Sequence, residues 1–268
     1  NLRVDRPNPR RKQRQPGLVI SARPVTQRNL PMSHDPILNI AWIDDYHGGD
    51  PLFVQSLARG LAARPLGKSP PILVHGGAER AGRLLEAQAI QVEYRDGVPA
   101  SHHTAARALI ERAYREVNKE TVAILTEFGV PAVGIQGCDR GLLTRAASGE
   151  LVVSHVGWLR QIVASGAVLV VSALVSGPDV DPVPVGEALT SIIRGFSAPD
   201  VQATVFHRGS SKQLKANTYI YLAEITGSMS DTDARTLQEL LAHGVRVVLS
   251  DARSAFDAEK GTVLRIST

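Results

Sequence analysis

Residues 71–78 join a short apolar run to two glycines and the start of a helix, and this pattern limits the fold more than any other. The run before the glycines predicts a buried strand, and Gly76-Gly77 predict a tight turn. Residues 79–89 then follow with the apolar spacing of an amphipathic helix. Backbone N–H groups at such a helix N-terminus can hold an anion, and glycine lets a ligand approach the backbone closely. We therefore expect a β–α unit with an anion-binding turn.

The same alternation of short apolar runs and helical segments continues along the chain. Residues 167–174 are apolar on both faces of a strand, which is typical of a parallel sheet covered on both sides. Repeated β–α units predict an α/β protein with a largely parallel sheet between helices. We expect strands at residues 37–43, 72–75, 91–94, 132–135, 151–153, 167–174, 201–206, 219–222, 245–249 and 262–266. We expect helices at residues 51–63, 79–89, 103–128, 156–164, 183–195 and 231–243.

Positive charge is concentrated at the start of the chain. Residues 1–31 hold eight Lys or Arg against one Asp, a net charge of +7, so the total of +4 leaves −3 for residues 32–268. Five prolines interrupt the same segment. We expect residues 1–34 to form a disordered basic tail. The tail is acid-poor like a transit peptide, but its prolines disfavour an amphipathic helix. It is either an extension ahead of Met32 or a segment that docks a partner.

The remaining composition excludes several classes of protein. Aromatic residues make up only 4% of the chain, and the body is mildly acidic, so we expect no nucleic-acid partner. The longest apolar runs are too short to span a bilayer, so we expect no membrane partner. A single cysteine, Cys138, excludes an intrachain disulfide and suits a reducing compartment. We expect a cytoplasmic protein without a metal site formed by its own side chains.

Four segments, in this order and spacing, resemble motifs of the amino acid kinase family. The segments are Val74-His75-Gly76-Gly77-Ala78, Glu116-Val117-Asn118-Lys119-Glu120, residues 132–143 (AVGIQGCDRGLL) and His155-Val156-Gly157 with the strand that follows Gly166. The resemblance covers about residues 37–268 and is greatest to acetylglutamate kinase, with the kinase of carrier-protein-bound aminoadipate a close second. It implies a three-layer α/β/α sandwich around an open, mainly parallel sheet, as in carbamate kinase. It further implies an N-lobe at 35–176 for an acyl amino acid, a C-lobe at 177–268 for ATP, and a homodimer or hetero-oligomer.

The resemblance also implies binding residues. Substrate such as N-acetylglutamate would lie at His75, Gly76, Gly77, Ala78 and Asp181. Nucleotide would lie at Arg208, Gly209, Ser210 and Lys212, with ATP and Mg²⁺ as cofactors. From its own chemistry, His75 is expected to bond the backbone of its turn and not to act as a base.

The lysines and the arginine of the family pattern are missing from this chain. The first lysine position holds Trp42, or Tyr46 if the alignment is shifted to use Gly48-Gly49. The second lysine position holds Asp231 or Thr232. The substrate-binding arginine position holds Pro99. The catalytic residues are therefore unknown from sequence, and loss of one preorganised donor typically slows a reaction by about 10²–10³.

Three hypotheses follow from this pattern. The chain is a catalytically impaired pseudokinase that serves as a non-catalytic subunit or regulator, which we favour. Alternatively, it is an active kinase in which Lys212, Arg208 or Lys119 replaces the missing lysines. As a third alternative, it is a sensor that binds an acylated amino acid at the Gly76-Gly77 turn without phosphorylating it.

Overall fold

The computed structural model describes residues 38–65, 67–196, 201–206, 219–225, 229–256 and 261–265. The predicted tail at 1–34 and the predicted nucleotide-binding residues Arg208, Gly209, Ser210 and Lys212 lie outside these ranges. In the described part of the chain, no helix combines the length and the apolar character that crossing a membrane requires.

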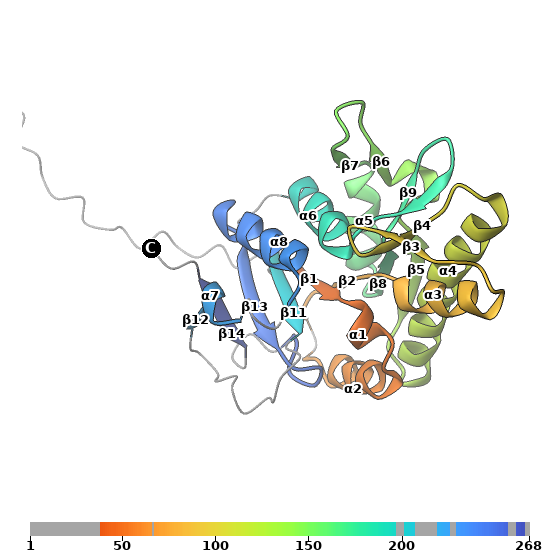
Figure 1. Cartoon of the computed structure of the whole chain (residues 1–268). Helices are drawn as coiled ribbons and strands as arrows, with labels where there is room; N and C mark the ends of the chain where they lie inside the picture. The colour runs from red at the N-terminus through yellow and green to blue at the C-terminus, as the bar shows by residue number, and fades with distance from the viewer. Residues whose placement is uncertain are drawn as a thin grey trace, which may run out of the picture. The chain divides into compact units, whose positions relative to one another are not determined.

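A sheet of eight described strands forms the centre of the fold, in the order β12-β14-β13-β11-β1-β2-β8-β5 (Figure 1). Every neighbouring pair is parallel except β13 and β14, which are antiparallel. The strands are β1 (Leu38–Ile43), β2 (Ile72–His75), β5 (Ala132–Gln136), β8 (Val168–Ser172), β11 (Val201–Phe206), β12 (Tyr219–Tyr221), β13 (Arg246–Ser250) and β14 (Thr262–Arg265). The sheet is thus mainly parallel, as the alternation predicts.

Two smaller sheets and a set of helices complete the described fold. One small sheet has the order β10-β9-β6-β7, and the other is the hairpin β3–β4. Their strands are β3 (Glu93–Arg95), β4 (Val98–Ala100), β6 (Leu143–Arg145), β7 (Leu151–Val153), β9 (Leu174–Ser176) and β10 (Val180–Pro182). The helices are α1 (Asp45–Gly48), α2 (Pro51–Ala62), α3 (Ala78–Ala87), α4 (Thr104–Glu127), the 3₁₀ turn η1 (Asp139–Gly141), α5 (Val156–Ala164), α6 (Val185–Gly195), α7 (Leu222–Ile225) and α8 (Asp231–Ala242).

Alternate residues of β1 point to opposite faces of the sheet and bury both. Ile40 and Trp42 belong to one apolar cluster, which also contains residues of α6 and α8. Ala41 and Ile43 belong to a second cluster, which contains residues of α2 and the end of α4. Since successive side chains of a strand alternate between faces, helices on both sides are needed to cover such a strand. This arrangement confirms the three-layer α/β/α class.

The strand predicted at 167–174 ends two residues earlier in the central sheet, at Ser172. The chain leaves the central sheet at Ala173, and the next three residues form β9 in the small sheet. The N–H of Ala173 still donates to the carbonyl of His75 at 2.9 Å, while its own carbonyl accepts from Val183 at 3.0 Å. Both parts are buried, so hydropathy alone gives no signal that the chain passes from one sheet to the other.

The helix predicted at 183–195 begins two residues later, at Val185. Pro184 stands at its N-cap, and residues 180–182 form β10. The very short elements α1, β4, β6 and β10 were not predicted, because three or four residues carry too little periodicity to detect. The other predicted elements lie within about three residues of their observed bounds where the structure describes them. The division into lobes after residue 176 stays a prediction.

Candidate functional site

Several parallel strands of the central sheet end at the same level. Ile43 of β1 is paired with His75 of β2, which in turn is paired with Ser172 of β8. The segments that follow these strands therefore meet at the carboxyl edge of the sheet, where open α/β sheets commonly bind ligands. The acidic pair Asp44-Asp45 and the turn Gly76-Gly77 lie side by side at this edge.

The predicted anion-binding turn holds an anionic group of the chain itself. Oδ1 of Asp45 accepts a hydrogen bond from the backbone N–H of Ala78, the first residue of α3, at 2.9 Å. A Cβ at Gly76 would lie 2.9 Å from the same oxygen. Gly76 is therefore required for this close approach, and the carboxylate benefits from the positive end of the α3 dipole.

The pKa of Asp45 is raised from 3.8 to about 6. Burial of the carboxylate is the largest cause, and the negative charges of Asp44 and Glu79 act in the same direction. The backbone N–H groups of Ala78 and Glu79 act in the opposite direction, but they do not outweigh burial. Among the described residues, no Lys, Arg or His forms an ion pair with Asp45. Asp45 is thus a partly buried carboxylate that, among the described residues, is stabilised by backbone amides and by no cation.

His75 is held in a buried hydrogen-bond chain below the turn. Its Nδ1 lies 2.6 Å from the carbonyl oxygen of Gly76, and its Nε2 lies 3.0 Å from Nδ2 of Asn118. Nδ1 therefore donates, and Nε2 accepts from the amide of Asn118 on α4. Burial lowers the pKa of His75 to about 4, so the ring is neutral at physiological pH. These contacts confirm that His75 bonds the backbone of its own turn.

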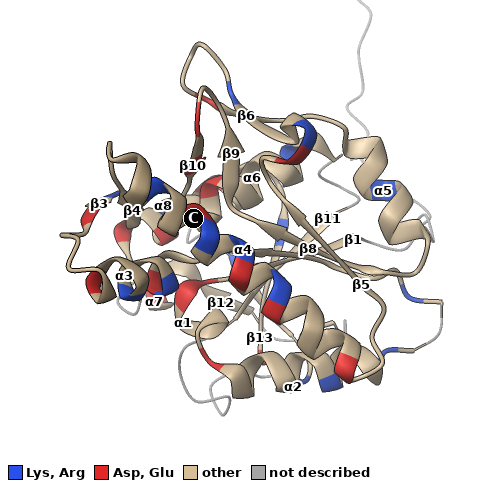
Figure 2. Cartoon of the chain, turned by 90° about the vertical axis from the view of Figure 1, so that its right-hand side faces the viewer, with Lys and Arg blue, Asp and Glu red and all other residues tan. Residues whose placement is uncertain are grey.

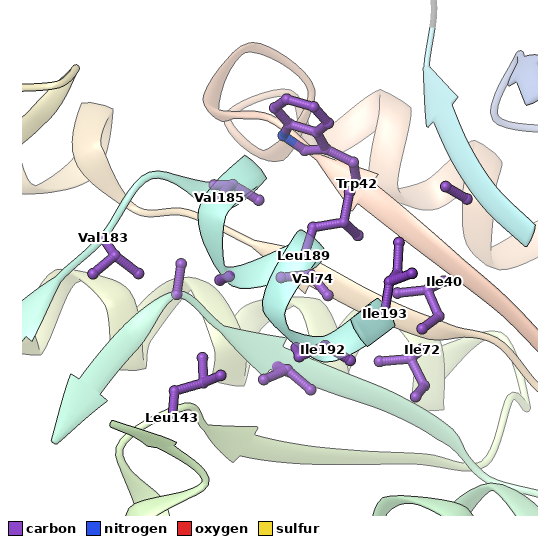
Figure 3. Close-up of a cluster of buried hydrophobic side chains, with 14 of the residues drawn as sticks. Ile40, Trp42, Ile72, Val74, Leu143, Val183, Val185, Leu189, Ile192 and Ile193 are labelled. Carbon is purple, nitrogen blue, oxygen red and sulfur yellow. The ribbon is translucent and has the colours of Figure 1, made fainter. Parts of the chain in front are cut away.

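Trp42 fills the space above the start of α6. Its indole is 5% exposed and lies beside Val185 (Figure 3). A Cβ at Gly186 would lie 3.0 Å from the indole and 2.6 Å from Oγ1 of Thr236 on α8. The indole Nε1 is buried without a hydrogen-bond partner in the described structure. This position therefore supplies packing between α6 and α8, and it supplies no positive charge.

A larger cavity, of about 470 Å³, lies between the β3–β4 hairpin, α4 and β10. Arg95, Arg107, Arg145, Asp181 and Glu187 are among its charged lining residues. Arg107 binds Asp179 and, at 3.0 Å, Asp181, while Arg145 binds Glu187 at 2.8 Å. The guanidinium of Arg95 lies 3.2 Å from Nε2 of His102 and has no carboxylate partner in the described part of the chain.

The arginines of α4 differ in their partners. Spacing along this helix predicts i,i+4 pairs on a solvated face for Arg107 and for the two arginines that follow it, Arg112 and Arg115. Those two arginines do pair with carboxylates four residues away, and Figure 2 shows the alternating charges along α4. Arg107 instead binds the segment before and within β10, more than 70 residues away in sequence. Only the tertiary fold brings these groups together, so no local signal could have found them.

Sequence comparison finds that this chain is similar to acetylglutamate kinases. It is 25% identical over 187 residues to an acetylglutamate kinase of Helicobacter hepaticus, covering 63% of this chain and 62% of that protein. It is 28% identical over 223 residues to one of Roseiflexus castenholzii, covering 82% of this chain and 80% of that protein. No protein-family model matches the chain. The chain thus spans less than two thirds of the Helicobacter relative.

Solved structures share the fold at lower sequence identity. N-acetylglutamate synthase of Neisseria gonorrhoeae superimposes with a TM-score of 0.62 at 15% identity, covering 87% of this chain and 60% of that one. Carbamate kinase of Giardia superimposes with a TM-score of 0.56 at 13% identity, covering 87% of this chain and 99% of that one. The chain is thus similar in sequence to acetylglutamate kinases and similar in fold to members of the amino acid kinase family.

Within this family pattern, the described lysine positions carry no cation. Trp42 packs as described above, and Thr232 lies in the first turn of α8, next to Asp231. The lysines that the structure describes are Lys68 and Lys119, and both are exposed and outside the lining of the three described cavities. In the described ranges, the cavity at the Gly76-Gly77 turn is therefore lined by no lysine, and its arginines, Arg80 and Arg83, pair with carboxylates.

Nucleotide phosphates, which are anions, fit this acidic part of the described structure poorly. Asp44 and Asp45 put carboxylates where phosphates would approach, and Asp45 already occupies the turn. Across the described ranges, no group of three His, Cys, Asp or Glu side chains is arranged to hold a metal ion. The roles of His75, Gly76, Gly77, Ala78 and Asp181 in binding substrate stay predictions.

Proposed function

We propose that this chain is an acetylglutamate kinase-like protein that has lost efficient phosphoryl transfer and acts as a pseudokinase. One observation carries the proposal: the carboxylate of Asp45 is bound at the Gly76-Gly77 turn, and the indole of Trp42 is packed at the family's lysine position. The relatives named acetylglutamate kinase suggest the ligand class, an N-acylated acidic amino acid with ATP as the co-substrate. By the same extension, we assign the chain to the cytoplasm and to arginine biosynthesis.

The chemistry of the reaction supports this proposal. Transfer of a phosphoryl group from ATP to a carboxylate brings two anions together, so catalysis depends on positioning and on positive charge. Trp42 supplies no charge, and Asp45 adds a negative one. Two like charges about 4 Å apart repel by about 1 kcal/mol in water and by about 4 kcal/mol at an effective dielectric constant of about 20. Each missing donor slows such a reaction by about 10²–10³.

An assay of ADP release tests the proposal. The purified chain at high concentration receives ATP, Mg²⁺ and N-acetylglutamate, and the Helicobacter hepaticus acetylglutamate kinase serves as the positive control. We expect release at the rate of the protein-free blank. Release that depends on both substrates and disappears in Arg208→Ala or Lys212→Ala would contradict the proposal and favour an active, rearranged site.

A second candidate function is binding of an acylated amino acid without catalysis. The cavity of about 470 Å³ favours it, because the guanidinium of Arg95 has no carboxylate partner among the described residues and lies beside apolar lining residues such as Pro99 and Ile110. Titration calorimetry with N-acetylglutamate alone should then show binding that Arg95→Ala weakens. Arg112→Ala is the matched control, since Arg112 is exposed and pairs only with Glu116. Absence of binding by the unmodified chain would reject the sensor and leave the pseudokinase proposal standing.

A pseudokinase acts through a partner, so we propose that the chain forms a homodimer or a hetero-oligomer with an active relative. Size-exclusion chromatography with light scattering, with and without a co-expressed acetylglutamate kinase, measures this directly. A monomer under both conditions would contradict the proposed partnership.

A further inference from the structure

The contact between Asp45 and Ala78 ties together two segments that are distant in sequence. Asp45 begins α1, a helix of only four residues, and its carboxylate bonds the first N–H of α3, 33 residues later. A helix of this length has too few internal hydrogen bonds to be stable alone. The side chain of Asp45 therefore helps to hold α1 against the Gly76-Gly77 turn.

Among the residues that the structure describes, the groups around Asp45 leave its charge uncompensated. Asp44 precedes it, and Glu79 of α3 faces it, and both are acidic. His75 at the end of β2 is neutral because burial lowers its pKa. Tyr114 of α4 is fully buried, and its pKa is raised by burial and by the nearby Asp45 charge. From α6, the neighbour of the turn is the apolar Val185.

Two arginines line the adjacent cavity of about 70 Å³ but bind other carboxylates. Arg80 bonds Glu120 at 2.6 Å and Glu116 at 3.5 Å, and Arg83 bonds Glu79 at 3.2 Å. Neither compensates the charge of Asp45. The closed contact is therefore a partly buried carboxyl group on backbone amides, in acidic surroundings.

We propose that Asp45 is a protonation-controlled latch: it holds the Gly76-Gly77 turn most tightly when it is neutral, and ionisation weakens this contact, so that the turn opens more often. In the released form, the carboxylate lies in water, and the N–H groups at the start of α3 become accessible. The latch is a property of this chain's own side chains and does not depend on whether the chain transfers phosphate.

The size and the direction of the effect follow from linkage. In the closed form the pKa of Asp45 is about 6, whereas a carboxyl group in water keeps the ordinary value of 3.8. The closed form thus binds the proton more tightly, so rising pH favours the released form. Between pH 4 and pH 6 the equilibrium shifts about tenfold per pH unit, by about 10²-fold in total. Above pH 6 the equilibrium between the closed and released forms no longer depends on pH.

Hydrogen exchange of the α3 amides tests the latch. Protection of the Ala78 and Glu79 amides is measured from pH 4.5 to pH 7.5 and corrected for the intrinsic pH dependence of exchange. We expect protection to fall by about 10-fold or more over this range, while the buried amide of Leu73 in β2 stays unchanged as an internal reference. Constant protection of Ala78 and Glu79 would overturn the proposal.

Two variants separate Asp45 from its neighbours. Asp45→Asn keeps the shape but cannot ionise, so its protection should be high and independent of pH. Glu79→Gln removes the neighbouring charge instead and should keep the fall in protection. The same fall in Asp45→Asn as in the unmodified chain would also overturn the proposal.

A third variant covers the case in which Asp45→Asn does not fold. Gly76→Ala places a Cβ 2.9 Å from the Asp45 oxygen and should expel the side chain. Protection of Ala78 at pH 4.5 should then drop to the level that the unmodified chain shows at pH 7.5. Protection that stays high at pH 4.5 would count against the latch.

Discussion

Replacement of Asp45 by Asn should stabilise this protein at neutral pH, although it removes one partner of a hydrogen bond to a charged group. The pKa of Asp45 is raised from 3.8 to about 6, so above pH 6 its buried charge lowers the free energy of unfolding by about 3 kcal/mol. Asn can still accept the N–H of Ala78, but the charge-assisted part of that bond is lost, about 1 kcal/mol. The net gain is about 1–2 kcal/mol, or roughly 2–8 °C in Tm.

The pH dependence makes this prediction sharper. The raised pKa of Asp45 makes the folded chain bind more protons than the unfolded chain between pH 4 and pH 6, so its contribution to stability falls as pH rises. The pKa of His75 is lowered from 6.5 to about 4, so its contribution falls as pH drops over nearly the same range, by about 3 kcal/mol. The two contributions oppose each other in the unmodified chain. In Asp45→Asn, of these two contributions only that of His75 remains. Between pH 7 and pH 4 the free energy of unfolding of the variant should therefore fall by about 3 kcal/mol more than that of the unmodified chain.

Urea unfolding followed by circular dichroism, at intervals from pH 4.5 to pH 7.5, measures both effects. Asp50→Asn is the matched control, because Asp50 is an exposed N-cap whose Oδ1 accepts the N–H of Leu52 at 2.9 Å. Asn caps helices about as well as Asp, so this control should change stability by only a few tenths of a kcal/mol. A destabilised Asp45→Asn at pH 7.5, or a pH profile parallel to that of the unmodified chain, would refute the reasoning.

Three further substitutions test the packing around the site, each by urea unfolding at pH 7.5. Gly77→Ala should lower the free energy of unfolding by about 1–3 kcal/mol, because the new Cβ would lie 2.8 Å from the Tyr114 ring. Gly157→Ala is the control, since its Cβ would meet no atom within 4 Å and should change stability little. Equal stability of the two variants would contradict the prediction. Asn118→Leu should lower the free energy of unfolding by about 3 kcal/mol or more. It leaves Nε2 of His75 and the carbonyls of Ile135 and Val170 without the amide that donates to them. A loss below about 1 kcal/mol would contradict this prediction and show that these buried groups find other partners. Ser230→Ala should lower the free energy of unfolding by about 1 kcal/mol, because the hydroxyl of Ser230 caps α8 by accepting the N–H of Asp233. An unchanged urea midpoint would mean that this cap does not stabilise the protein.

Local sequence patterns determined most of the fold. The apolar run before Gly76-Gly77 gave β2 with its observed bounds, because a fully buried strand must be apolar on both faces. The helix predicted at 231–243 agrees with α8 within one residue, and Ser230 stands at its N-cap. Helix starts and turns depend on the residues within a few positions, so a single sequence carries these signals. The family pattern, its missing lysines and Trp42 were likewise visible in the order of residues.

Only the tertiary structure decided what occupies the site. The sequence shows Asp45 after one strand and Gly76 after another, but it does not show that β1 and β2 are neighbours. Their pairing brings Oδ1 of Asp45 to the N–H of Ala78, and burial there raises its pKa. The contacts of Arg107 with Asp179 and Asp181 arise in the same way. Burial, charge proximity and cavity shape depend on groups that are distant in sequence, so a local pattern can name these side chains but cannot bring them together.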